Sequence, residues 1–177
     1  MDCPQCKGYQ LEPKEISPGL LAAVCPKCDG SLLSLMNYRY WIDQHAENSV
    51  AEIAEDVITE DSSEAKLCPK CSKFMSRFQI GRDINHRLEL CTSCDEAWLD
   101  KGEWKLLQQL DIHNKLPKIF TDAWQRNIRL ERQEETLKAR YRKKLGDDFT
   151  KVDEFKQWLD QHVEKRDIRQ YLNTTLK

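Results

Sequence analysis

Cys68-Pro69-Lys70-Cys71, followed after nineteen residues by Cys91-Thr92-Ser93-Cys94, is the stretch that decides the fold of this chain. The N-terminus repeats the arrangement, with Cys3-Pro4-Gln5-Cys6, eighteen residues and then Cys25-Pro26-Lys27-Cys28. Both separations lie in the range typical of four-cysteine zinc sites. A Cys-x-x-Cys turn directs two sulfurs at one point, and two such turns joined by a hairpin complete a tetrahedron with Zn–S distances of about 2.3 Å.

The eight cysteines are therefore predicted to hold two zinc ions per chain. Because four protein ligands leave no position for water, each site is expected to be structural rather than catalytic. Gly8 and Gly30, each two residues after the second cysteine of a pair, suit the positive φ that such a turn often needs. The two predicted ligand sets are Cys3, Cys6, Cys25 and Cys28, and Cys68, Cys71, Cys91 and Cys94.

Composition narrows the class of protein. With 40% hydrophobic residues and 33% charged residues, the apolar content is low for one large core. Residues 1–100 hold 10 Lys and Arg against 17 Asp and Glu, whereas residues 101–177 hold 18 against 13.

No apolar run approaches the roughly 18 residues of a membrane span or forms a secretion signal. We expect no membrane association and a cytoplasmic, reducing location, where cysteines bind metal; four disulfides in a secreted protein are the alternative.

The two cysteine sites belong to an internal repeat. Asp100 and Glu103 form a capping-box pattern, which predicts a helix from Lys101 to about Leu110, and Ser34 can cap the equivalent helix. A shift of 66 residues aligns Cys25-x-x-Cys28-Asp29 with Cys91-x-x-Cys94-Asp95, Leu32-Leu33 with Trp98-Leu99, Ser34 with Asp100, and Tyr38 with Trp104.

Four aromatic residues, Tyr38, Trp41, Trp98 and Trp104, follow the second cysteine pairs of the repeats. One interpretation is a stacking platform for nucleic-acid bases. The other is that they form the small core of each unit, and this is favoured because small domains have few other residues to bury.

Residues 46–64 contain seven acidic residues and no Lys or Arg. Their apolar residues recur at helical spacing, and Ser49 with Glu52 is a further capping-box pattern. The segment is predicted to be an acidic amphipathic helix. It either binds a partner, mimics the charge of nucleic acid within the chain, or packs its apolar stripe on a ribbon, and packing is favoured because amphipathic stripes usually face a core. The stripe consists of Val50, Ile53, Ala54, Val57 and Ile58.

The C-terminal region is basic and is expected to be helical. Pro117 suits the first turn of a helix that Gly146 would end, and a second helix is predicted from about Val152 to Leu172, with a restart at Asp167. Residues 115–145 contain ten basic and four acidic side chains. A run of this kind can contact phosphates, and the alternative is a solvated helix face. The candidate nucleic-acid-binding residues are Arg140, Arg142, Lys143 and Lys144.

The block from Cys91 to Glu103, Cys-Thr-Ser-Cys-Asp-Glu-Ala-Trp-Leu-Asp-Lys-Gly-Glu, together with Cys68-Pro-Lys-Cys71, resembles the bacterial TFIIB-type zinc-ribbon family, a transcription-factor zinc finger. The resemblance covers about residues 66–110 well and residues 1–45 more loosely. Glu96 replaces the usual glycine, and the first unit has Leu32-Leu33-Ser34 in place of the Trp-Leu-Asp-x-Gly-Glu block. The resemblance implies zinc binding and a role in transcription.

The predicted fold class is a small zinc-stabilised α+β protein with two four-cysteine zinc ribbons, each a short antiparallel hairpin followed by a helix, and an α-helical C-terminal region. The expected segments are a first ribbon and helix at 1–45, the acidic helix or linker at 46–65, a second ribbon and helix at 66–111, and a basic helical hairpin at 112–177.

The predicted function is that of a non-catalytic zinc-binding adaptor for protein, nucleic acid or both. The histidines are scattered, and neither a catalytic His motif nor a Gly-rich phosphate loop is present, so no enzyme activity is expected. A protein partner is favoured because the ribbons are acidic, nucleic acid is a candidate ligand of residues 115–145, and the C-terminal helices offer a route to a homo-oligomer. The alternative is a redox-responsive zinc switch or thiol–disulfide protein that uses the Cys-x-x-Cys pairs.

Overall fold

The computed structural model describes residues 1–45 and 64–174. The chain divides into two compact units, residues 1–129 and residues 130–177, which are described separately below. The predicted acidic helix, apart from Glu64, lies outside the described residues. No helix of the described residues is both long and apolar enough to cross a membrane.

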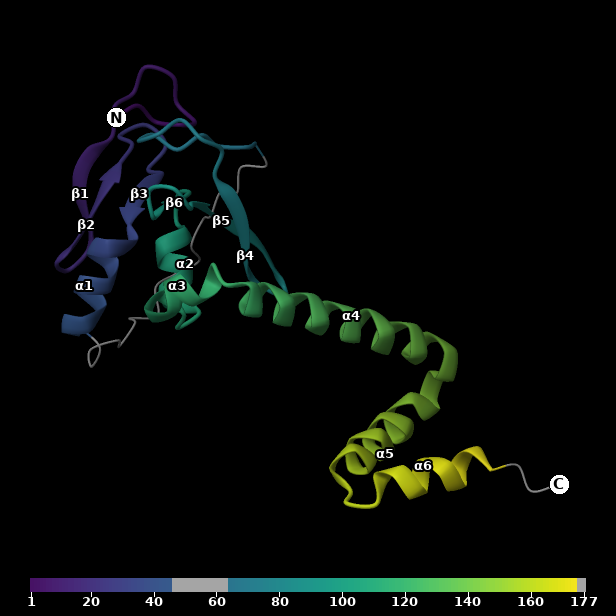
Figure 1. Cartoon of the computed structure of the whole chain (residues 1–177). Helices are drawn as coiled ribbons and strands as arrows, with labels where there is room; N and C mark the ends of the chain where they lie inside the picture. Colours follow the sequence, from purple (N-terminus) through teal and green to yellow (C-terminus); the bar gives the residue numbers. More distant parts are fainter. Residues whose placement is uncertain (46–63, 175–177) are drawn as a thin grey trace. The chain divides into compact units, whose positions relative to one another are not determined.

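Within the described residues, the first unit is built on a six-stranded antiparallel sheet with strand order β1-β2-β3-β6-β5-β4. The first repeat contributes β1 (Glu12–Ser17), β2 (Leu20–Val24), β3 (Ser31–Ser34) and helix α1 (Leu35–His45) (Figure 1). The second repeat contributes β4 (Ser76–Gly81), β5 (Ile84–Cys91), β6 (Glu96–Leu99) and helix α2 (Glu103–Gln109). The expectation of a mixed α+β structure with antiparallel strands and helices is therefore confirmed.

The two repeats meet at the centre of this sheet, where β3 pairs with β6. Leu32 lies directly opposite Trp98, and its neighbour Leu33 lies opposite Ala97. Because the 66-residue shift makes Leu32 and Trp98 equivalent, this pair lies on a local pseudo-twofold axis that relates the repeats. The repeats are consequently two halves of one sheet.

The two faces of the central strands bury different groups. Successive strand residues point to opposite faces. Leu33 and Leu99 pack in the larger core, which includes residues of α1 and α2, whereas Leu32 and Trp98 pack among the cysteines. Tyr38, Trp41 and Trp104 are buried in the larger core, and Trp98 is fully buried beside the cysteines. The burial of all four aromatic side chains supports the core interpretation over the stacking platform.

The first unit continues through short helical segments, η1 (His113–Lys115) and α3 (Leu116–Ile119), into helix α4 (Asp122–Leu145). Pro117 lies in the first turn of α3, as predicted. The continuous helix expected from Pro117 to Gly146 is nevertheless interrupted. The Thr121 hydroxyl accepts the backbone N–H of Trp124 at 3.3 Å, so Thr121 caps a new helix.

In the second unit, α4 ends at Gly146, whose φ of 54° is left-handed, as expected for a helix stop. Helix α5 (Phe149–Gln161) follows the short segment η2 (Gly146–Asp148), and helix α6 (Lys165–Asn173) follows α5. The helical segment predicted from about Val152 to Leu172, with a restart at Asp167, is therefore two helices. The extended backbone of His162 separates them, and the second begins at Lys165 rather than at Asp167.

Candidate metal centres

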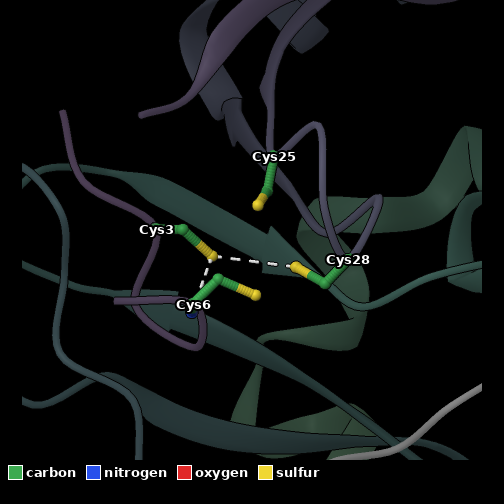
Figure 2. A group of neighbouring side chains, drawn as sticks. All are labelled: Cys3, Cys6, Cys25 and Cys28. Carbon is green, nitrogen blue, oxygen red and sulfur yellow. Dashed lines mark hydrogen bonds between the residues drawn. The ribbon is translucent and has the colours of Figure 1, made fainter. Parts of the chain in front are cut away.

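The first candidate metal centre gathers the sulfurs of Cys3, Cys6, Cys25 and Cys28 (Figure 2). The first pair comes from the loop before β1, and the second pair comes from the loop between β2 and β3. All four sulfurs lie within 4.8 Å of one another, and the sulfurs of Cys3 and Cys28 are 3.7 Å apart. Figure 2 shows the four side chains pointing toward a common point.

The second centre repeats this arrangement with Cys68, Cys71, Cys91 and Cys94. Cys68 and Cys71 precede β4, Cys91 is the last residue of β5, and Cys94 lies in the turn to β6. The sulfurs again lie within 4.8 Å of one another, with Cys71 and Cys91 at 3.5 Å. In both clusters the first cysteine of each pair is buried and the second is half-buried.

These distances suit a tetrahedral metal ion. Four sulfurs at about 2.3 Å from a zinc ion are about 3.8 Å from one another, close to the sulfur separations of 3.7 and 3.5 Å observed here. A disulfide requires about 2.05 Å, and all eight cysteines are free. Each cluster can therefore hold one metal ion with a closed set of soft ligands, a donor set that suits zinc.

The thiols of one cluster cannot all ionise together without a cation. The backbone hydrogen bond from Lys73 lowers the pKa of Cys71 to about 7. The hydrogen bond with Cys71 and burial raise the pKa of Cys94 to about 12. A divalent ion would displace these shared protons and stabilise all four thiolates.

The turns that hold the sulfurs follow one backbone pattern in both repeats. Asp29 donates its N–H to the carbonyl of Cys25 at 3.0 Å, and Asp95 does the same to Cys91 at 2.9 Å. Both aspartates have left-handed backbones, with φ of 54° and 56°. Gly8 has the positive φ that the sequence predicted, at 81°.

The prediction for Gly30 is wrong, because the left-handed residue of that turn is Asp29 and Gly30 has no positive φ. Gly30 is required for a different reason. A Cβ atom at this position would lie 2.4 Å from Cζ2 of Trp98. The indole of the second repeat thus lies directly on the backbone of the turn that carries Cys28.

A buried polar network includes Lys66 and Glu89, which lie two positions before the ligands Cys68 and Cys91. The ammonium group of Lys66 donates to Glu89 at 2.9 Å and to Asp100 at 3.0 Å, and all three side chains are at most 2% exposed. Burial lowers the pKa of Lys66, but the hydrogen bonds and charges of Glu89 and Asp100 together outweigh burial, so the net pKa is raised and Lys66 stays a cation. The indole N–H of Trp98 donates to Asp100 at 2.7 Å. Asp100 therefore links the ammonium group of Lys66 to Trp98 of the central strand β6 through hydrogen bonds.

The capping box predicted from Asp100 and Glu103 is found only in part. One half is present, because the backbone N–H of Asp100 donates to Glu103 at 2.8 Å. The Asp100 carboxylate accepts from Lys66, Trp98 and Gln5, and the residue that directly precedes α2 is Gly102, which has no side chain with which to cap the helix. Helix α2 accordingly begins at Glu103, two residues later than predicted, after Gly102 with a φ of 80°.

Lys66 and Glu89 were not anticipated from the sequence. Glu89 lies between Leu88 and Leu90 in the strand that leads to Cys91, and all of these side chains are buried. The sequence does carry one signal for Glu89: it is a charged residue within an apolar strand, two positions before the ligand Cys91. Lys66 carried no such signal, because it precedes Leu67 and Cys68 in an otherwise irregular segment.

The basic residues predicted to contact phosphates occupy the last turns of α4. Arg140, Arg142, Lys143 and Lys144 are all exposed. Arg142 lies 3.8 Å from Glu135 and over the ring of Phe149, and Arg140 lies over the ring of Tyr141. The four side chains thus form an exposed cationic group, separate in sequence from both cysteine clusters.

The histidines do not join the cysteine clusters of the described residues. His45 stacks on Trp41, and His162 contacts Trp158. His86 Nδ1 lies 3.5 Å from the buried carboxylate of Glu103, and His113 is buried against Trp104. The four histidines therefore make packing and surface contacts rather than contacts with the cysteine sulfurs.

Comparison with protein-family models, with curated proteins and with solved structures finds no match to this chain.

Proposed function

We propose that the two repeats are zinc ribbons, each holding one structural Zn²⁺, and that the protein is a non-catalytic adaptor. The observation that carries this proposal is the gathering of eight free thiols into two groups of four at sulfur separations suited to a tetrahedral ion. Four protein ligands leave no position for a reactive water, which supports a structural role. The resemblance to TFIIB-type ribbons suggests that the adaptor acts in transcription.

Elemental analysis of the full chain, purified under reducing conditions without added metal, tests the zinc assignment. We expect two zinc ions per chain, and one in the variant with Cys3→Ser and Cys6→Ser. Ser93→Ala, a change between two ligands in the same turn, should keep both ions and serves as the control. A reduced chain that contains neither zinc nor iron would overturn the proposal.

The partner is expected to be protein, nucleic acid or both. Residues 1–100 are acidic, and an acidic surface repels phosphates, so a nucleic-acid role depends on the basic end of α4. Arg140, Arg142, Lys143 and Lys144 are the residues assigned to this role. Each phosphate contact by a basic side chain steepens the salt dependence of binding.

Fluorescence anisotropy with a single-stranded RNA and a duplex DNA, measured across a salt series, tests this role. Changing the four residues to Glu should lower affinity by more than about tenfold at low salt and flatten the salt dependence. The matched control changes Lys151, Lys156, Lys165 and Arg166 to Glu. Equal binding by the unaltered chain and both variants would leave protein as the partner class.

A redox-responsive zinc switch is the second candidate function. The specific observation in its favour is that the second cysteine of every pair, Cys6, Cys28, Cys71 and Cys94, is only half-buried and can meet an oxidant. Peroxide would take two electrons from two thiolates, a disulfide would form, zinc would be released and peroxide would be reduced to water. Zinc release at micromolar peroxide that dithiothreitol reverses would favour this candidate, and retained zinc would exclude it.

A further inference from the structure

Three contacts connect the turns of one cysteine cluster to the opposite repeat. The first is Trp98, whose indole lies against Gly30, two residues after Cys28. The Trp98 side chain is fully buried and packs in one cluster with cysteines of both metal centres, namely Cys3, Cys25, Cys68 and Cys91. One side chain of the second repeat thus belongs to the same buried cluster as ligands of both metal centres.

The second contact is made by Gln5, which lies between Cys3 and Cys6. Its amide donates to Asp100 of the second repeat at 2.9 Å. Asp100 also accepts from Trp98 and from Lys66. The turn that carries two ligands of the first cluster is therefore hydrogen-bonded to the polar network of the second repeat.

The third contact runs in the opposite direction, from the first repeat to the second cluster. The backbone N–H of Leu35, at the start of α1, donates to the carbonyl of Asp95 at 3.0 Å. Arg39, one turn later, pairs with the carboxylate of Asp95 at 2.5 Å. Asp95 is the residue that follows Cys94, so the second cluster is held by the helix of the first repeat.

We infer that the two cysteine clusters form one cooperative pair, in which zinc bound at one cluster raises the affinity of the other for zinc. The inference rests on the proposed zinc function. A cluster without metal leaves its turns unconstrained, and the three contacts above then lose one of their two partners. Coupling between two sites is reciprocal, so each cluster affects the other by the same factor. Trp98, Gln5 and Asp95 are positioning residues for the ligands of the opposite repeat or of both.

Native mass spectrometry of the unaltered chain, titrated with zinc under reducing conditions, is the first test. At half-saturation, two equal and independent sites give a one-zinc species of about half the population, and unequal independent sites give more. We expect the one-zinc species to be clearly below half. A value of half or above, together with unchanged affinity in the two cysteine variants described next, would overturn the inference. A chain that takes up no zinc would instead overturn the proposed function, so the two failures are distinguishable.

Competition with a chromophoric chelator tests reciprocity. The variant with Cys25→Ser and Cys28→Ser should lower the zinc affinity of the second cluster by about 5- to 150-fold, and Cys91→Ser with Cys94→Ser should lower the affinity of the first cluster by the same factor. Unchanged affinity in both variants would contradict the coupling.

Gln5 and Lys70 provide a matched pair of milder variants that leave the cores intact. They occupy the same position in their Cys-x-x-Cys turns, but Gln5 contacts Asp100 of the other repeat, whereas Lys70 pairs with Glu96 of its own repeat. Gln5→Ala should reduce the coupling factor by about three- to tenfold. Lys70→Ala should change the affinity of the second cluster and leave the coupling factor unchanged. A coupling factor that is the same in Gln5→Ala and Lys70→Ala would show that the Gln5–Asp100 contact does not transmit the coupling.

Discussion

The two repeats of the first unit share topology and cysteine geometry, but they differ in what is buried between their cysteines and the central strands. The second repeat buries Lys66, Glu89 and Asp100 as a charged network. Alignment of the repeats on their cysteines places uncharged residues, Met1, Ala23 and Ser34, at the equivalent positions. The first repeat therefore keeps the same strand topology without charged side chains at these three positions.

A second difference lies at the pseudo-twofold axis. The second repeat has Trp98 where the first has Leu32, and the residue that the larger indole meets is Gly30. The equivalent of Gly30 in the second repeat is Glu96, which has a full side chain. This is also the position where the sequence departs from the glycine of the TFIIB-type pattern. The comparison teaches that a large residue on one side of the axis requires a small residue on the other.

The largest effect is expected from breaking the charged network. Lys66→Met removes the cation that Glu89 and Asp100 share and leaves Arg77, 3.3 Å from Glu89, as the remaining cation of the network, which should cost about 3 kcal/mol of unfolding free energy. Urea denaturation of the zinc-loaded chain measures the loss. The double variant Lys66→Met with Glu89→Met, which makes the second repeat more like the first, should be more stable than the single variant. A single variant as stable as the unaltered chain would show that the network does not contribute.

A smaller effect is expected at the axis. Gly30→Ala places a methyl group 2.4 Å from an indole carbon and should lower the unfolding free energy by about 1–3 kcal/mol. The same urea measurement applies. Adding Trp98→Leu, which copies Leu32, should make the alanine tolerable, so the two substitutions should be non-additive. Additive losses would contradict the close approach of Trp98 to Gly30.

The smallest effect concerns the segment after α2. His113 is buried, and its backbone carbonyl accepts the hydroxyl of Tyr38 from the first repeat at 2.6 Å. Burial lowers the pKa of His113 below its ordinary value, and the charge of Asp111 opposes this shift. The unfolded chain therefore binds the proton more readily, so the contribution of His113 to stability is present at neutral pH and is lost as the pH falls below about 6.5.

Unfolding free energies measured between pH 7.5 and pH 5.5, at saturating zinc, test this sign. The unaltered chain should lose more stability on acidification than His113→Phe, which retains the aromatic contact with Trp104 and cannot be protonated. Zinc release at low pH affects both chains equally, so the difference between them isolates His113. Identical pH profiles would contradict the assignment.

Much of the candidate site follows from local sequence. Cys-x-x-Cys spacing, the 66-residue repeat and the helix stop at Gly146 depend on neighbours in the chain, and each has a direct physical cause. The boundaries that failed, such as the break at Thr121 and the late start of α2, depend on which of two competing hydrogen bonds a side chain makes. Asp100 illustrates this, because its carboxylate accepts from Lys66 and Trp98 in a buried network, and α2 begins only after Gly102.

Local sequence signals could not predict that the two repeats share one sheet. Pairing of β3 with β6 joins residues more than sixty positions apart, and either strand alone is only four residues long. The functions of Gly30 and Lys66 become visible only once Trp98, Glu89 and Asp100 are placed beside them. Long-range packing, rather than spacing, determines these roles.

The central claim is that two sets of four sulfurs hold one shared sheet together. Hydrogen exchange of the full chain, followed by mass spectrometry on peptides that cover β3 and β6, tests it most directly. We expect strong protection in both strands with zinc, and loss of protection in both strands together, over the same range of chelator concentration, when zinc is withdrawn. Protection that survives zinc removal, or that is lost from one strand while the other keeps it, would show that the sulfurs do not hold the shared sheet together.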